Sequence, residues 1–460
     1  MTNAIDAATL RTFGEAIVGA SAGGDRLAHK TVAAIEGDLF ALGWPSGQTL
    51  GTVPDIQHRF SLGRWSCRQA VTILQARGLL DVRRGPGGGV YVAEPSVVDV
   101  ARAFVLFLVL SDARLRHLYE VRSIVWRAVL DALTRSAPIA PLEPVEGDPL
   151  VQLAAATGRN GLHFVAALLD EVMRLSQGPA RTIIVGSGAW ANRLIQAINA
   201  GEGASIAAMS MEMESRDAYL RSEQRVTFIA PLVALRPLDR HNNAGVLAAR
   251  LLEDILGERS NGVSQPCTEW DISGHYGFSM PVVRQALRLL EDIGAVDIVR
   301  GRSGGMRRAV PQSGAMIRLL FPCLASRNVS EEDILEMVGA LAMNAPSLAA
   351  ERVRQGQLPD ALAKCASPTA YISALDPLAA EHLLLELSGN PVLTILVRAF
   401  GLQSLFCPPM RGRLTPRSFV ATRSLNIDIM KAIESAQPEE AARLAAEKDR
   451  TMRQLVQIGA

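Results

Sequence analysis

Two stretches of the chain align with each other without a gap. The first runs from Arg26 to Pro95 and the second from Asn242 to Pro311, and 18 of the 70 aligned positions are identical. Unrelated stretches would share roughly 6% of their positions by composition alone. The identity is well above that level, so the sequence indicates an internal duplication. We expect the two copies to form the same local structure.

A region of helical hydrophobic period follows each copy. LRHLYEVRSIVWRAVLDAL follows the first copy, and ILEMVGALAMNAPSLAAERV occupies the corresponding place after the second. Farther on, Asn160 in ATGRN matches Asn390 in ELSGN at a slightly larger spacing than that of the repeat. We therefore expect two halves, each a small unit followed by a helical bundle. The expected segments are an N-terminal extension (1–24), the first unit (25–95), the first bundle (96–236), a linker (237–245), the second unit (246–311) and the second bundle (312–460).

Each unit is predicted to begin with three helices. The first helix of the first unit ends at WPSG, and its expected apolar face consists of Val32, Ile35, Leu39, Phe40 and Leu42. Thr52 and Asp55 form a capping pair at the start of a short second helix. RWSCRQAVTILQAR predicts a third helix that Gly78 ends, with an inward face of Cys67, Ala70, Val71 and Leu74.

The sequence LLDVRRGPGGGVYV predicts two short strands joined by a glycine-rich turn that carries Arg83 and Arg84. The turn lacks the Lys-Ser/Thr that a phosphate-binding loop requires, so a hairpin is expected. Three helices with a tight turn between the second and third, followed by a basic hairpin, are typical of a winged helix-turn-helix. The predicted fold class is therefore mainly α, with two winged helix-turn-helix domains, each followed by an all-α helical bundle.

Two segments, GRWSCRQAVTILQARGLLDVRRGPGGGVYV and SMPVVRQALRLLEDIGAVDIVRGRSGG, resemble the N-terminal domain of the GntR family of bacterial transcription regulators. The resemblance implies that the third helix of each unit is a recognition helix and that the hairpin is a wing. The two bundles resemble, more loosely, the ligand-sensing domain of the FadR-like branch. The resemblance implies a DNA-binding transcriptional regulator, expected to be a repressor, whose partners are a double-stranded DNA operator and a small-molecule effector.

Arginines at the start of the third helix are the main candidates for DNA contact. Arg64 and Arg68 lie one helical turn apart on one face, from which guanidinium groups reach guanine or phosphate. Two such arginines alone are more typical of a solvated basic face, but a basic wing beside them favours DNA binding. The expected DNA-contacting residues are Thr52, Arg64, Trp65, Ser66, Arg68, Arg83 and Arg84 in the first unit, and Ser279, Arg284, Arg300 and Arg302 in the second.

The second unit is less suited to DNA. Met280 stands where the first unit has Arg64, and residues 242–311 carry 8 basic and 8 acidic side chains against 8 and 5 in residues 26–95. Attraction to phosphate is therefore concentrated on the first unit. In both units the usual arginine of the family's second helix is replaced, by Pro54 and Trp270. The alternative function is a duplicated regulator in which one or both units have become protein-interaction modules without sequence-specific DNA binding.

The helical bundles lack the residues of a metal site. Metal-binding members of the FadR-like branch use one Asp and three His, whereas the first bundle has only His117 and His163 and the second only His382. Val151 and Glu381 stand where the family has its first histidine ligand. No metal or other cofactor is therefore expected.

Arg122, in YEVRS, is a candidate effector-binding residue because it matches an arginine common in the family's first sensing helix. Its counterpart in the second half, when the alignment of the repeat is continued without a gap, is Val338. A structural ion pair accounts for Arg122 equally well, so the sequence leaves both interpretations open.

The composition narrows the remaining classes of function. The net charge of +1 gives no whole-chain argument about nucleic acid, and five widely spaced cysteines fit reduced thiols in a cytoplasmic protein. The apolar run Ala103 to Leu110 is too short to span a membrane. Hydrolase, zinc-peptidase and P-loop motifs do not occur in the sequence, so the protein is not expected to be an enzyme.

Ordinary members of the family pair two chains to present two recognition helices. This chain carries both units, which would pair at a high effective concentration. We therefore expect a monomeric pseudo-dimer with a pseudo-two-fold axis. A homodimer of whole chains, with four winged helices, is the alternative.

Overall fold

The computed structural model describes residues 27–136, 138–139, 141–145, 148–177, 188–219, 224–226, 243–257, 268–299, 305–327, 329–357, 367–406 and 416–458. This part of the chain is mainly helical, as the sequence predicts. The expected N-terminal extension, 1–24, lies outside these ranges. No helix within them is long and apolar enough to cross a membrane.

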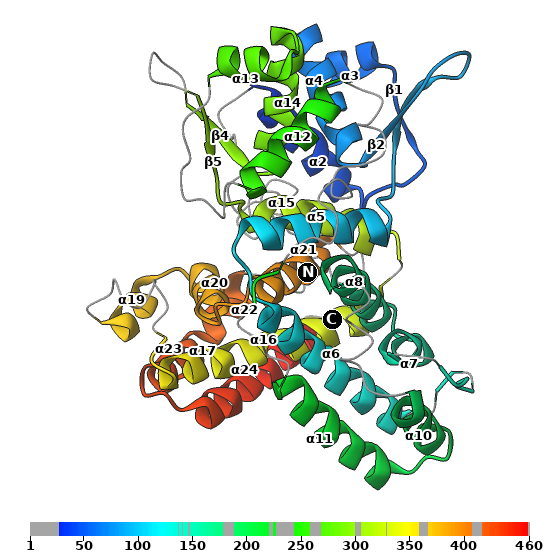
Figure 1. Ribbon diagram of the computed structural model, residues 1–460. Helices are drawn as coiled ribbons and strands as arrows, with labels where there is room; N and C mark the ends of the chain where they lie inside the picture. The colour runs from blue at the N-terminus through cyan, green and yellow to red at the C-terminus, as the bar shows by residue number, and fades with distance from the viewer. Residues whose placement is uncertain are drawn as a thin grey trace.

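The molecule has three layers (Figure 1). The two units form the top layer in the view. Helices α5 (Val97–Leu110) and α15 (Ser313–Ala325) lie side by side beneath them, and they contact each other. The remaining helices of both bundles form the lower layer. The hairpins of the two units lie at opposite outer edges of the top layer.

The first unit contains three helices and a three-stranded antiparallel sheet. Its elements are α2 (Leu27–Ala41), β1 (Thr49–Gly51), α3 (Val53–Arg59), α4 (Arg64–Ala76), β2 (Leu80–Arg83) and β3 (Gly89–Val92), with strand order β1-β3-β2. In the hairpin, Asp81 lies opposite Tyr91 and Arg83 opposite Gly89. Strand β1 was not expected from the sequence because it is only three residues long and its pairing is irregular at Gly51.

Local sequence signals explain most of this unit. Thr52 and Asp55 form the expected capping box at the start of α3. Gly78, with φ +73°, follows α4 in a left-handed conformation that favours glycine. The expected inward face of α4 is confirmed, since Cys67, Ala70, Val71 and Leu74 are buried. The prediction for Leu42 was wrong: α2 ends at Ala41, so Leu42 leaves the helical face and is 60% exposed.

The second unit has the same order of helices and a two-stranded hairpin. Its elements are α12 (Asn243–Gly257), α13 (Glu269–Tyr276), α14 (Met280–Asp292), β4 (Val296–Val299) and β5 (Gly305–Arg308). Thr268 and Asp271 repeat the capping box. Helix α12 begins at Asn243, so the end of the expected linker is helical; the rest of that linker lies outside the described residues.

The lower layer comes from both bundles. The first contributes α6 (Leu115–Arg135), α7 (Leu150–Ala156), α8 (Asn160–Gln177), α10 (Gly188–Asn199) and α11 (Gly203–Tyr219). The second contributes α16 (Glu331–Ala342), α17 (Asn344–Arg354), α19 (Pro368–Ala374), α20 (Pro377–Leu387), α21 (Pro391–Phe406), α22 (Pro416–Ala421), α23 (Arg423–Glu434) and α24 (Pro438–Ile458). Helices α6 and α16 begin at positions that the alignment of the repeat pairs, Leu115 and Glu331. Pro346 cannot donate to the carbonyl of Ala342, which explains why α16 ends where α6 continues.

The middle layer crosses between the halves. Arg318 of α15 pairs with the buried carboxylate of Glu36 in α2, with 3.1 Å between Nη1 and Oε2. Phe321 of α15 packs edge-on against Phe40 of α2, with ring centroids 4.6 Å apart. Conversely, Leu106 and Leu110 of α5 belong to the core of the second unit. Each of these helices therefore packs against the unit of the other half.

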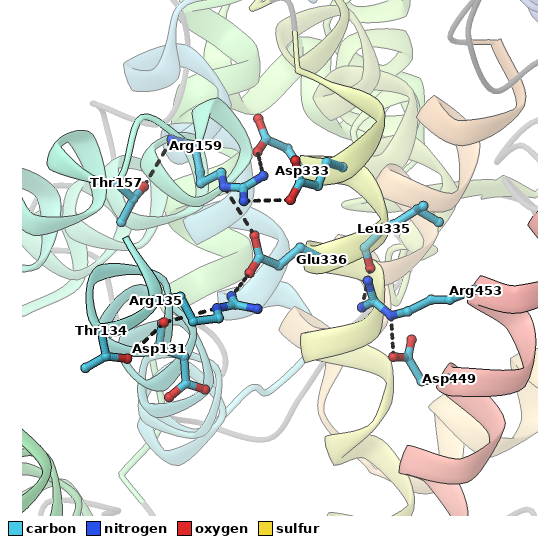
Figure 2. Close-up of polar contacts among 11 residues, drawn as sticks. Asp131, Thr134, Arg135, Thr157, Arg159, Asp333, Leu335, Glu336, Asp449 and Arg453 are labelled. Carbon is cyan, nitrogen blue, oxygen red and sulfur yellow. Dashed lines mark hydrogen bonds and ion pairs between the residues drawn. The ribbon is translucent and has the colours of Figure 1, made fainter. Parts of the chain in front are cut away.

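Ion pairs and hydrogen bonds join the two bundles at two places, one at each of the aligned residues Asn160 and Asn390. Arg159, just before α8, binds Glu332 at 2.8 Å and lies near Glu336 at 3.6 Å, both on α16 (Figure 2). The amide of Asn160 donates to the buried Asp333 carboxylate at 3.1 Å. These contacts join α8 of the first bundle to α16 of the second.

The second contact of this kind involves Asn390, just before α21. Its side-chain amide donates to Glu120 Oε2 of α6 at 2.8 Å and to the carbonyl of His117 at 3.0 Å. Arg352 of α17 pairs with the same Glu120 carboxylate at 3.1 Å. Both asparagines that the sequence aligns thus bind the opposite half, and the halves form one continuous body.

Candidate functional site

The N-terminal part of α4 presents two cations. Arg64 is its first residue and Arg68 lies one turn later, and both side chains are exposed. Within the described ranges no carboxylate forms an ion pair with either guanidinium. Gly63 at the N-cap makes no side-chain cap, so the helix end is open to a ligand that supplies acceptors.

The hairpin adds two further cations. Arg83 ends β2, and its guanidinium lies over the ring of Tyr91 at 4.1 Å from the centroid. The Tyr91 hydroxyl donates to the carbonyl of Gly87 at 2.9 Å, which holds the turn. A Cβ at Gly88 would lie 2.6 Å from the carbonyl oxygen of Arg83, so this tight turn requires glycine. Arg84 is exposed beside it.

The remaining residues of the first unit that were expected to contact DNA are Thr52, Ser66 and Trp65. The Thr52 hydroxyl donates to Asp55 Oδ2 at 2.7 Å and accepts from the Asp55 amide, so it acts as a helix cap. The Thr52 hydrogen bonds lower the pKa of Asp55. Ser66 is half-buried in α4. Trp65 lies in the same helix, and its side chain is outside the described part of the structure.

In the second unit, one arginine of the third helix forms an ion pair with the helix before it. Arg284, the counterpart of Arg68, pairs through Nε with Glu269 Oε2 at 2.8 Å. Glu269 is the first residue of α13 and stands where the first unit has Val53. Ser279 is exposed at the N-cap of α14 without a side-chain cap. Arg300 and Arg302 lie outside the described residues.

An exposed tryptophan lies near this ion pair. Trp270 follows Glu269 in α13 and is 74% exposed, the position at which the resembled family has an arginine. Met280, half-buried at the start of α14, stands where the first unit has the exposed Arg64. The two units thus differ chemically at the start of the third helix.

A cavity of about 170 Å³ lies inside the second bundle. Helices α16, α17, α20, α21 and α24 all contribute to it, and its wall is mostly apolar. Apolar wall residues include Val338, Ala342, Leu385, Leu405, Phe419 and Met452. The space is similar in size to an apolar cavity that holds benzene.

Arg398 of α21 brings a cation into this wall. Its Nη1 donates to the Ser313 hydroxyl, at the first residue of α15, over 3.1 Å. Burial lowers the pKa of Arg398, and the charge of Glu386 opposes the effect only in part.

Lys448 and Arg453, the other two cations of the wall, are paired within the protein. Lys448 pairs with Glu381, which also accepts from Asn426 at 2.9 Å. Arg453 binds Asp449 at 2.6 Å. The residues that line the cavity thus include three cations and two carboxylates, and the charge of Glu386 acts on Arg398 as well.

The first bundle is filled at the equivalent positions. Arg122 and Trp126 align with Val338 and Ala342 of the second half, and both are fully buried. Arg122 Nη2 pairs with Asp148 Oδ2 at 2.9 Å. Trp126 stacks on Trp190 with ring centroids 6.0 Å apart. These contacts favour the structural interpretation of Arg122 over effector binding.

Burial disfavours the charged form of the three histidines in the bundles, and these residues do not cluster with one another. Burial lowers the pKa of His117 to about 3 and that of His382 to about 4, and it also lowers the pKa of His163. His117 Nδ1 accepts from the amide of Arg114 at 3.2 Å. Among the described residues, no group of three or more His, Cys, Asp or Glu side chains could hold a metal ion.

Three of the residues above were missed by the sequence analysis: Glu36, Glu269 and Arg398. A signal existed for Arg398, since PVLTILVRAFGLQSLF is an apolar helix with one charge. Nothing in the sequence places Glu36 beside Arg318, because these residues are 282 positions apart. Comparison with known protein families and with curated proteins finds no match to this chain.

Proposed function

We propose that the protein is a cytoplasmic DNA-binding transcriptional regulator of the GntR type, a repressor under small-molecule control, and that its first unit reads DNA. The pair Arg64 and Arg68 carries this proposal, because both are exposed at the start of α4. Arg83 and Arg84 extend the basic surface along the hairpin. A helix end reads base edges while a basic hairpin binds the backbone.

The arrangement of elements supports two winged helix-turn-helix domains. In each unit a short capped helix, α3 or α13, precedes the longer α4 or α14, and a β-hairpin follows. Helices α4 and α14 begin at Arg64 and Met280, which the repeat aligns, and this agrees with a duplication. The two helices also contact each other.

The contacts between the bundles support a pseudo-dimer within one chain. Asn160 and Asn390 each bind the opposite half, so the halves form the pairing that two chains would otherwise supply. Light scattering should give a particle of 49.3 kDa in solution. A particle of twice that mass would instead support the homodimer.

The direct test is selection of bound duplexes from a random-sequence pool by the purified full chain. Recovery of a shared sequence motif is expected, with one half-site better defined than the other. The double variant Arg64→Ala/Arg68→Ala should lose that enrichment while keeping its melting temperature. Recovery of random sequence by the unmodified protein would overturn the DNA-reading function.

A second function is favoured for the second unit. Glu269 neutralises Arg284, and the exposed Trp270 offers an apolar contact. We propose that this unit contributes little to base reading and serves instead as an interaction module. Arg284→Ala in the same selection tests this, because the recovered motif should not change.

A further inference from the structure

We propose that Tyr91 is a positioning residue of the first hairpin and that its ring holds the guanidinium of Arg83 ready for a DNA phosphate. The inference rests on the proposed function and deepens it, because it names the side chain that prepares one of the DNA-binding cations. Tyr91 acts through Arg83 and need not touch DNA itself.

Tyr91 lies in the middle of the three-stranded sheet of the first unit. Its strand, β3, pairs with β2 on one side and with β1 on the other, so that Tyr91 lies opposite both Asp81 and Thr49. The Tyr91 hydroxyl donates to the carbonyl of Gly87 at 2.9 Å. The backbone of Tyr91 is therefore held from both sides, and its ring is tied to the turn.

Arg83 stands at the end of β2, which is an edge strand of this sheet. The residue directly opposite is Gly89, which offers no side chain to Arg83. Residues two apart along a strand share a face, so Tyr91 is the diagonal neighbour of Arg83, within reach of a long side chain. The guanidinium carbon of Arg83 accordingly lies 4.1 Å from the centroid of the Tyr91 ring.

The ring holds the guanidinium without neutralising it. An aromatic face attracts a cation, and the N–H donors at the edge of the guanidinium stay available to a phosphate. Asp81 shares this face of the hairpin, but within the described part of the chain no ion pair joins it to Arg83. In the second unit, by contrast, Arg284 is held by the carboxylate of Glu269.

Holding Arg83 in place favours binding because it removes freedom that binding would otherwise cost. An exposed arginine loses several rotamers when a phosphate fixes it, and a guanidinium that is already fixed loses fewer. Phosphates occur in every DNA sequence, so the gain should be the same for all duplexes. We therefore expect Tyr91 to affect affinity without affecting base preference.

The second hairpin has no such pair. Val299 and Arg307 stand where the first hairpin has Arg83 and Tyr91. Residues 296–308 contain no aromatic side chain, so no ring of that hairpin can hold a cation. The pair therefore belongs to the unit that is proposed to read DNA.

The position of Arg83 is tested without DNA, by NMR of the full chain with isotope-labelled arginine, in which Arg83→Lys identifies the Arg83 signals. The ring current of Tyr91 should shift the Cδ protons of Arg83 upfield. Tyr91→Phe keeps a ring and should retain most of this shift, whereas Tyr91→Leu should remove it. Arg83 signals that are unshifted in the unmodified protein, or that stay shifted in Tyr91→Leu, would overturn the inference.

The role of Tyr91 in binding is tested by a double-mutant cycle on the selected duplex and a random one. Tyr91→Leu should lower both affinities by about threefold, since an exposed cation–π contact is weak. In the Arg83→Ala background the same change should have no further effect, because the group that Tyr91 positions is already gone. Tyr91→Phe should bind nearly as well as the unmodified protein. Damage to the fold would act equally in both backgrounds, and that result would contradict a positioning role.

Thr49→Ala is the matched control, since Thr49 lies opposite Tyr91 on the strand away from Arg83. Its effect on affinity should be the same with and without Arg83→Ala. If Thr49 couples to Arg83 as strongly as Tyr91 does, the ring has no special role. Additive effects of Tyr91→Leu and Arg83→Ala in a chain that binds DNA would refute the inference alone. If the unmodified chain binds neither duplex, the proposed function fails and the role in DNA binding fails with it.

Discussion

The two halves share an order of elements but differ at the third helix of the unit and in the interior of the bundle. In the first half α4 carries Arg64 and Arg68 and the bundle is filled by Arg122 and Trp126. In the second half Arg284 is bound by Glu269, and the bundle holds a cavity. The comparison teaches that two halves with the same order of elements need not carry the same side chains at equivalent places, because the backbone order does not fix the surface or the filling of the bundle.

The largest expected effect tests whether the first bundle depends on its internal ion pair. Asp148→Asn leaves the buried Arg122 without its carboxylate, so the free energy of unfolding should fall by about 3–5 kcal/mol. Val338→Ala, at the position equivalent to Arg122, trims a cavity wall and should cost about 1 kcal/mol. Urea unfolding of both variants measures the difference. Equal losses would mean that the two bundles are stabilised in the same way.

The next effect sharpens the contrast between α4 and α14, which are proposed to differ in DNA reading. Arg64→Ala or Arg68→Ala should each cost about 1–3 kcal/mol of affinity for the selected duplex, with relaxed base preference. Arg83→Ala should weaken specific and random duplexes alike, because it is expected to bind phosphate. Fluorescence anisotropy with both duplexes separates the roles. If Arg64→Ala lowers both affinities equally, it contacts only the backbone.

A pH effect should act on both bundles. His117 and His382 are held neutral by burial, with pKa values of about 3 and about 4, whereas an unfolded histidine has a pKa near 6.5. The unfolded chain therefore takes up protons first, and stability present above pH 6.5 is lost as the pH falls towards 3. Each histidine should cost roughly 2 kcal/mol between pH 7 and pH 5. His117→Gln and His382→Gln should each flatten the decline measured by urea unfolding at the two pH values. An unaltered slope would place the acid sensitivity elsewhere.

The smallest effect concerns the capping boxes, in which the units are alike. Thr52→Ala and Thr268→Ala each remove a hydroxyl that accepts from a backbone amide, and each should cost about 1 kcal/mol. Both capping hydrogen bonds are exposed, so the loss should not depend on the bundles. Melting temperatures of the two variants should therefore fall by similar amounts. A much larger loss for one would show that its unit is held by other contacts.

Local elements could be predicted because their causes lie within a few residues. The Thr52–Asp55 pair predicted the start of α3, Gly78 marked the end of α4, and the pattern of α4 predicted its buried face. Leu42 was misplaced because the pattern does not show that the helix ends at Ala41. Strand β1 was missed because it forms only against β3, which lies much later in the chain.

The sequence by itself determined the repeat, the mainly helical composition of both halves and the surplus of cations on the first unit. Each follows from spacing, periodicity or charge, which act locally along the chain. Only the tertiary structure decided that Glu269 binds Arg284, that Arg122 meets Asp148, and that Arg318 reaches Glu36 across the halves. These pairs join elements that meet only after the chain has packed, and the buried charges among them are stable only in that packed geometry.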